Sequence, residues 1–127
     1  MDNRINTDRI LTLFTELVAI DSLSFGERKI SNVLKRELKD LGFEVFEDDT
    51  GTCCGADTGN LYAFLKGTDP GKPPILLSAH MDTVVPGIGK KACIDNNKGI
   101  ITSGGDTVLG ADDVAGLVEI LDGVRLA

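Results

Sequence analysis

Apolar residues recur at three- and four-residue spacing in two segments near the start of the chain. The first segment begins at Thr7, with Asn6 or Thr7 in position to cap a helix. The second follows residues 24–27 (SFGE), which have the form of a capping box. Gly42 stands where a left-handed C-terminal cap is expected. Two amphipathic helices are therefore predicted, with apolar faces formed by Ile10, Leu11, Phe14, Leu17 and Val18 in the first and by Ile30, Val33, Leu34, Leu38 and Leu41 in the second.

Three later segments have the pattern of strands. Residues 43–48 (FEVFED) alternate apolar and acidic positions, as a half-exposed strand does, and Leu61 to Leu65 form a second candidate. The third, Ile75 to Ala79, is almost wholly apolar and is expected to be covered on both faces. Turn and loop residues rich in Gly and Pro separate these segments. The order predicts an α/β fold, a partial sheet with helices packed on both faces.

The remainder of the chain predicts a further strand region and a last helix. Residues 100–105 and 107–110 are expected to form a hairpin or a strand with its return. A helix is expected from about Asp113 to the final residue, with an apolar face that includes Leu117 and Leu121. Because this apolar pattern continues to the end of the sequence without a cap, we expect residues 1–127 to be the N-terminal part of a longer chain.

Composition narrows the classes of function. The 127 residues are 42% hydrophobic and 26% charged, which is typical of a globular domain. A formal net charge of -7 disfavours binding to nucleic acid, whose phosphates are also negative. The sequence shows neither an apolar run of about 20 residues, as a membrane span requires, nor the apolar core of a signal peptide. We therefore expect a cytoplasmic protein that binds neither nucleic acid nor membranes.

The cysteines indicate a reducing compartment. Cys53 and Cys54 are adjacent and Cys93 stands alone, so the three thiols form no CxxC pair and cannot all be paired within one chain. A structural role is expected for them. A zinc site made of Cys54, Cys93 and His80 is a weaker alternative, since no ligand spacing supports it.

His80, the only histidine, directly follows the third predicted strand. The carboxyl ends of strands in an α/β sheet border the crevice where ligands bind. Asp82 lies two residues further on, so in extended backbone both side chains point to the same side and the carboxylate is placed to orient the imidazole. A metal ligand is one interpretation of His80, and a partly buried histidine with a purely structural role is the other.

A second acidic group lies in residues 109–116 (LGADDVAG), where Asp112 and Asp113 precede the last predicted helix. Asp112 is explained equally well as an N-cap, because aspartate before a helix is among the commonest local patterns. Read together with His80, however, it completes a pair of nitrogen and oxygen donors of the kind that zinc accepts.

Residues 78–87 (SAHMDTVVPG) and 105–116 (GDTVLGADDVAG) resemble the paired motifs of the zinc-dependent exopeptidases that include peptidase T, carboxypeptidase G, aminoacylase and acetylornithine deacetylase. The stretches LVAIDSLSFGE and LKDLGFEV resemble the N-terminal helices of the same family. The resemblance extends over essentially the whole chain and is closest to the tripeptidase branch, because HMDTV and LGADD occur together.

The resemblance implies a role for each matching residue. His80 would bind one zinc ion, Asp82 would be the catalytic residue that orients His80, and the Asp112 carboxylate would bridge two zinc ions. The peptide bond between Asp112 and Asp113 would be cis. Gly110 and Gly116 would give the turn its backbone freedom. Val114 departs from the family, where lysine is frequent, and this leaves substrate handling or local packing open at that position.

The family also requires residues that this sequence does not supply. A general-base glutamate, further acidic ligands, a second histidine and a lid or dimerisation domain would all lie beyond Ala127. The expected function is therefore a part of a tripeptide aminopeptidase that acts on small peptides, binds at most one zinc ion and is inactive alone. The alternatives are a non-catalytic binding or assembly module that self-associates, half of a split enzyme that needs a partner chain, and an unrelated α/β domain.

Overall fold

The computed structural model describes residues 5–126. It contains four α-helices and two antiparallel strand pairs among these residues, so the α/β class is confirmed. The elements are α1 (Thr7–Val18), α2 (Arg28–Asp40), β1 (Glu44–Glu47), α3 (Thr50–Cys54), β2 (Leu61–Phe64), β3 (Ala92–Asp95), β4 (Ile100–Ser103) and α4 (Ala111–Leu126). The expected helical end at Ala127 lies outside the described residues.

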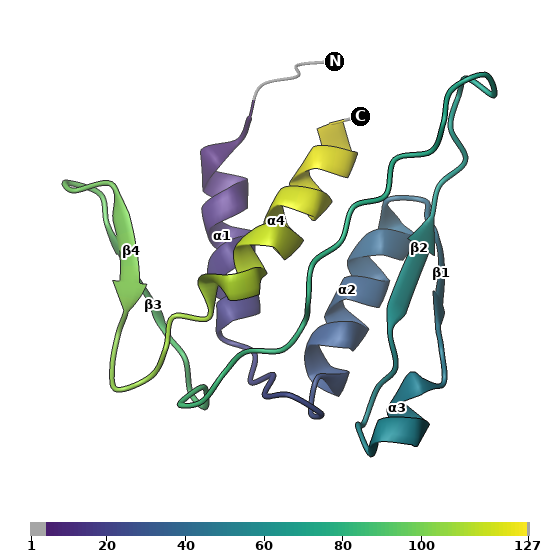
Figure 1. The fold of residues 1–127 in the computed structure, drawn as a ribbon. Coiled ribbons are helices and arrows are strands. Elements are labelled where there is room, and N and C mark those ends of the chain that lie inside the picture. The colour runs from purple at the N-terminus through teal and green to yellow at the C-terminus, as the bar shows by residue number, and fades with distance from the viewer. Residues whose placement is uncertain (1–4, 127) are drawn as a thin grey trace.

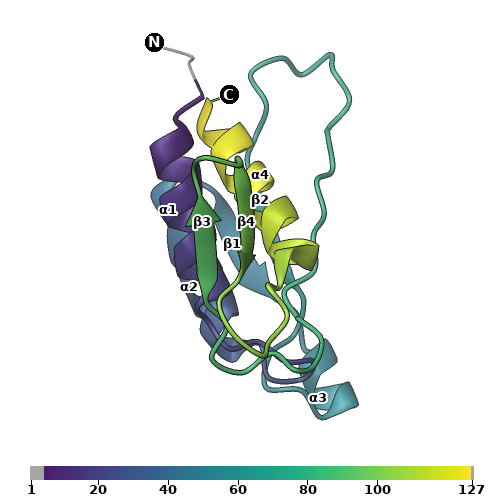
Figure 2. The same cartoon turned by 90° about the vertical axis from the view of Figure 1, so that its left-hand side faces the viewer.

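The helices form the centre of the molecule. α1 and α4 pack side by side, the β3–β4 hairpin lies on one side of them, and α2 with the β1–β2 pair lies on the other (Figure 1). Figure 2, turned by 90°, shows the β3–β4 hairpin in front of α1 and α4. Nine buried apolar side chains from α1, α2 and α4 make the core: Phe14, Leu17, Val18, Ile30, Leu34, Val114, Leu117, Val118 and Leu121.

The predictions for the first two helices differ in outcome. α1 is capped as expected by Asn6, whose side chain accepts a hydrogen bond of 2.9 Å from the backbone N–H of Arg9. Gly42 has the predicted left-handed conformation, with φ of 89°. The prediction of a capping box in residues 24–27 is wrong. Neither Ser24 nor Glu27 caps α2, because the Glu27 carboxylate accepts from the N–H of Phe25 and the Ser24 hydroxyl is bonded to another part of the chain. The first N–H of the helix, that of Arg28, donates instead to Asp57 Oδ1 at 2.9 Å.

The β1–β2 pair confirms two predicted strands, with Glu44 opposite Phe64 and Glu47 opposite Leu61. Because side chains alternate between the two faces of a strand, the face that carries Phe46, Tyr62 and Phe64 is directed away from the one that carries Val45. The Phe46 and Tyr62 rings stack at 4.8 Å and are both exposed. α2 packs on this pair.

The third predicted strand is wrong for the chain as described. Ile75–Ala79 passes α2 and α4 as an extended segment and pairs with no strand among residues 5–126 (Figure 1). Ile75 and Leu76 are 86% and 90% exposed, the opposite of the expected double burial. The single sheet covered by helices on both faces is consequently replaced by two separate pairs, because a central strand requires neighbours on both sides and none lies beside this segment in the described chain.

The later elements also correct the expected pairing. Ile100–Ser103 is a strand, but its partner is Ala92–Asp95 rather than residues 107–110. α4 contains non-helical backbone at Asp112 and Asp113, so its regular part begins after Asp113, close to the predicted start. Among the described residues, no helix has both the length and the apolar character needed to span a bilayer.

Candidate metal centre

Two loops bring His80, Asp82 and Asp112 together. His80 and Asp82 lie on the extended segment that follows Ile75–Ala79, and Asp112 lies at the start of α4. His80 Nδ1 is 3.0 Å from Asp82 Oδ1 and 3.0 Å from the Asp82 carbonyl oxygen. His80 Nε2 is 2.9 Å from Asp112 Oδ1. The imidazole is therefore held between two carboxylates, one at each ring nitrogen.

The local environment favours the charged forms of His80 and Asp82. The Asp112 carboxylate at Nε2 raises the pKa of His80, an effect that partial burial of the ring opposes. A hydrogen bond from the Ser24 hydroxyl is the main cause that lowers the pKa of Asp82, again against desolvation. The Asp112 side chain is 95% exposed and that of His80 is 51% exposed. The imidazole edge and the Asp112 carboxylate are thus open to an incoming ligand.

The backbone around Asp112 has the features expected from the family motifs. The peptide bond between Asp112 and Asp113 is cis, as predicted, and so is the bond between Val85 and Pro86. Gly110 has φ of 79°, which confirms its need for backbone freedom. Gly116 is not among the glycines with positive φ, so the backbone freedom expected there is not confirmed. A Cβ at this position would lie 2.4 Å from Asp113 Oδ1, which accepts a hydrogen bond from the Gly116 N–H.

Val114, the position that departs from the family, is 1% exposed and belongs to the apolar core. A valine here packs against the helices that support the site. Of the two roles left open for Val114, substrate handling and local packing, its burial therefore supports packing.

The sequence did not predict the role of Lys90. Its ammonium group is buried and donates to the carbonyl oxygens of Ile20 at 2.9 Å and Gly87 at 3.1 Å, while its methylene groups lie against Gly110. Burial lowers the pKa of Lys90. The side chain thus joins the loop after α1, the loop that contains Gly87 and the loop that precedes Asp112. The signal in the sequence was weak: two glycines, Gly87 and Gly89, precede Lys90 and are typical of a turn or of a close approach between backbone segments.

The alternative zinc site made of cysteines is contradicted. Cys53, Cys54 and Cys93 are free and exposed. Nowhere in residues 5–126 do three or more His, Cys, Asp or Glu side chains form a group suited to hold a metal ion. His80 and Asp112 therefore provide two facing donors, which is only part of a coordination shell.

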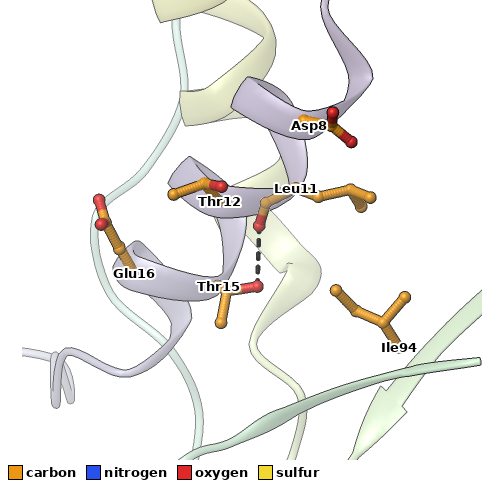
Figure 3. A pocket seen from close by; sticks show the side chains of 6 residues that line it. All are labelled: Asp8, Leu11, Thr12, Thr15, Glu16 and Ile94. Carbon is orange, nitrogen blue, oxygen red and sulfur yellow. Dashed lines mark hydrogen bonds between the residues drawn. The ribbon is translucent and has the colours of Figure 1, made fainter.

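A shallow depression elsewhere does not contribute to this centre. It lies between α1 and β3 and is lined by Asp8, Leu11, Thr12, Thr15, Glu16 and Ile94 (Figure 3). The Thr15 hydroxyl there is already bonded to the Leu11 carbonyl oxygen at 2.8 Å.

Known proteins share this fold. The crystal structure of aminopeptidase PepT from Bacillus cereus superposes with a TM-score of 0.91 at 46% identity, over 96% of this chain and 32% of that protein. A tripeptidase from Staphylococcus aureus gives 0.90 at 39% identity, with the same coverage. The chain belongs to the exopeptidase family of peptidase T. The uncharacterised Bacillus subtilis protein YqjE is 45% identical over 122 residues.

This peptidase T-like chain spans about a third of the length of the relatives it matches, 32% for both PepT and YqjE. No protein-family model matches it. The similarity covers 96% of the chain in each case and therefore includes the loops of His80, Asp82 and Asp112 as well as the helical core.

Proposed function

We propose that this chain supplies one part of the active site of a zinc-dependent peptidase that acts on small peptides, in the manner of a tripeptide aminopeptidase. The observation that carries the proposal is the imidazole of His80 held between Asp82 at Nδ1 and Asp112 at Nε2. Histidine ligands of zinc commonly have a carboxylate on the second ring nitrogen, which fixes the ring and raises its basicity. Similarity to PepT and the tripeptidase supports the substrate class.

The two donor groups that the chain provides, the His80 imidazole and the Asp112 carboxylate, are compatible with zinc. An imidazole nitrogen and a carboxylate oxygen are ordinary zinc ligands, and here they face each other at an exposed edge. His80 would bind through Nε2 while Asp82 retains Nδ1, and Asp112 would supply an oxygen shared between two ions. When bound, zinc would polarise the scissile carbonyl group and lower the pKa of a water molecule.

The residues of this chain then have distinct roles. Asp82 holds the imidazole in place and keeps its proton on Nδ1, so that the lone pair of Nε2 is directed outward. Asp112 presents a carboxylate that is almost fully exposed at the open side of the ring. The sequence contains one histidine, so a second imidazole ligand would have to come from another segment or chain. We infer that the 127 residues alone bind at most one zinc ion weakly and do not hydrolyse tripeptides.

Zinc titration of the purified chain tests this proposal. Isothermal calorimetry is expected to show at most one weak site, lost in His80→Ala and in Asp112→Asn but retained in Asp106→Asn, an exposed acidic control. Circular dichroism would establish that each variant is folded. Undiminished zinc affinity in His80→Ala would contradict the metal site. Tripeptide turnover by the purified chain, abolished by His80→Ala, would contradict the inferred inactivity.

A second function, an assembly module or half of a split enzyme that pairs with a separate chain, is favoured by one observation. Large apolar side chains are exposed on the described part of the chain, including Phe46 and Phe64 on one face of the β1–β2 pair, both at 58%, and Leu76 at 90%. Exposed apolar patches of this kind mark interaction surfaces. Multi-angle light scattering is expected to show association that rises with concentration. A clean monomer at all concentrations would count against self-association.

The proposals for cellular context follow from the sequence. A cytoplasmic location and small peptides as substrates in the complete enzyme remain proposals, supported by the acidic composition and by the peptidase relatives. Fractionation of the source cells, with detection of this chain in the membrane pellet, would contradict the first of them.

A further inference from the structure

Ser24 lies beside the candidate metal centre, although its sequence pattern predicted a role in capping α2. The backbone N–H of Thr83 donates to the Ser22 carbonyl oxygen at 2.8 Å, and Leu23 and Thr83 form a parallel bridge. The segment that contains Ser24 is therefore aligned with the segment that contains Asp82. Ser24 comes at the end of this alignment, immediately before the chain turns away.

The turn that follows fixes where Ser24 is placed. Phe25 has φ of 72°, a left-handed conformation that is uncommon for an aromatic residue. It is held by the Glu27 carboxylate, which accepts from the Phe25 N–H at 2.8 Å, and by a bond of 2.8 Å from the Gly26 N–H to the Leu23 carbonyl oxygen. The Phe25 carbonyl oxygen also accepts from the N–H of Asp57. Glu27 thus stabilises the turn, and the Ser24 hydroxyl is available for another partner.

That partner is Asp82. The Ser24 hydroxyl donates to Asp82 Oδ2 at 2.6 Å, while Asp82 Oδ1 is 3.0 Å from His80 Nδ1. Each carboxylate oxygen of Asp82 thus has its own partner, Oδ2 the Ser24 hydroxyl and Oδ1 the His80 ring. A carboxylate held at a single oxygen can rotate about its terminal torsion, which is broad and roughly two-fold, whereas a second bond fixes its plane.

We propose that Ser24 is a positioning residue that fixes the Asp82 carboxylate and through it the imidazole of His80. The hydrogen-bonded series runs from Ser24 through Asp82 and His80 to Asp112, and joins the loop after α1 to the start of α4. Its importance for zinc binding rests on the proposed function, but the effect on the imidazole itself does not.

The expected effect is partial rather than complete. The Asp82 carbonyl oxygen also lies 3.0 Å from His80 Nδ1 and remains when the serine is removed. Groups that orient a histidine ligand typically change metal affinity by about 10- to 100-fold. Because Ser24 acts one step further away, the lower end of this range, a loss of about tenfold, is expected in Ser24→Ala.

The single histidine gives a direct test, since its ring nitrogens produce the only imidazole signals of the chain. Long-range ¹H–¹⁵N spectra would be recorded without metal, at a pH above the midpoint of the His80 titration. In the unmodified chain the proton is expected mainly on Nδ1, which faces two oxygens of Asp82. Ser24→Ala is expected to shift the tautomer population toward Nε2–H, and Ser24→Thr, which retains the hydroxyl, to restore it.

Ser78→Ala is the matched control, because it removes an exposed hydroxyl two residues before His80. Zinc affinity measured by calorimetry on the same variants forms the second readout. An unchanged tautomer population in Ser24→Ala would overturn the inference. A shifted population in a chain that binds no zinc would support the role of Ser24 in positioning and instead contradict the proposed zinc site. A shift equally large in Ser78→Ala would also overturn the inference.

Discussion

At the scale of single residues, Glu47 is an acidic group outside the candidate site that pairs with two cationic side chains. Its carboxylate accepts from both terminal nitrogens of Arg28, at 2.8 and 2.9 Å, from Lys35, and from the Gly59 N–H at 3.1 Å. The hydrogen bonds from Arg28 are the main cause that holds the pKa of Glu47 well below its ordinary range. One side chain thus joins α2, the end of β1 and the segment before β2.

This environment predicts a specific dependence of stability on pH. Because the pKa of Glu47 is lower in the folded than in the unfolded chain, its contribution is fully present above the unfolded value of about 4.3 and is lost as the pH falls toward the folded value. Glu47→Gln is expected to lower the free energy of unfolding by about 2 kcal/mol at pH 7. The difference in unfolding free energy between Glu47→Gln and the unmodified chain should become smaller below pH 4.

Urea unfolding at several pH values between 3 and 7 checks this prediction. Glu44→Gln, at an exposed position of the same strand, is the control and is expected to change the unfolding free energy little. If Glu47→Gln lowers the free energy of unfolding equally at pH 3 and at pH 7, the ionisation of Glu47 is not the cause of the lost stability.

At the scale of secondary-structure elements, α1 and α4 are joined by an ion pair as well as by apolar packing. Arg9 Nε donates to Asp122 Oδ1 at 2.7 Å, and a second guanidinium nitrogen binds the same oxygen. Asp122 is 7% exposed, so its charge has little compensation from water. The pair fixes how α4 lies along α1, and with it the position of the Asp112 end of α4.

Removal of this carboxylate is expected to be costly. Asp122→Ala should lower the free energy of unfolding by about 2 kcal/mol, because the partly buried Arg9 loses its partner. Arg36→Ala breaks an exposed pair with Glu37, 3.8 Å long, and should cost less than about 0.5 kcal/mol. Thermal or urea unfolding would compare the two, and equal losses would mean that the α1–α4 ion pair adds nothing beyond a surface contact.

At the scale of the whole molecule, the apolar core is restricted to α1, α2 and α4, while a strand-like apolar segment lies outside it. Ile75, Leu76 and Leu77 are 86%, 90% and 52% exposed, whereas Leu34 is 3% exposed. A side chain that makes few contacts contributes little to the stability of the fold.

This contrast gives a further prediction. Leu76→Ser should change the free energy of unfolding by less than about 0.5 kcal/mol, while Leu34→Ala should lower it by about 2 to 5 kcal/mol. Denaturant unfolding of both variants provides the measurement. A loss in Leu76→Ser as large as that in Leu34→Ala would mean that the segment is packed in solution, by association or otherwise.

Features that depend on local patterns were predictable from the amino-acid sequence. The three-and-four periodicity gave α1, α2 and the regular part of α4, because an amphipathic helix places its apolar residues on one face. The two-residue spacing of His80 and Asp82 correctly predicted that their side chains meet. The resemblance between motifs further predicted the cis bond after Asp112, and it led to the peptidase T family.

Features that depend on which distant residues become neighbours emerged from the folded chain. Ser24 had an adequate local explanation as a cap, yet it binds Asp82, 58 residues further along the chain. The apolar pattern of Ile75–Ala79 predicted a buried strand, but burial requires neighbouring segments that the described chain does not place there. Lys90 is buried because three loops converge on it. Local periodicity specifies which face of an element is apolar, whereas the partner of that face is set by contacts between remote segments.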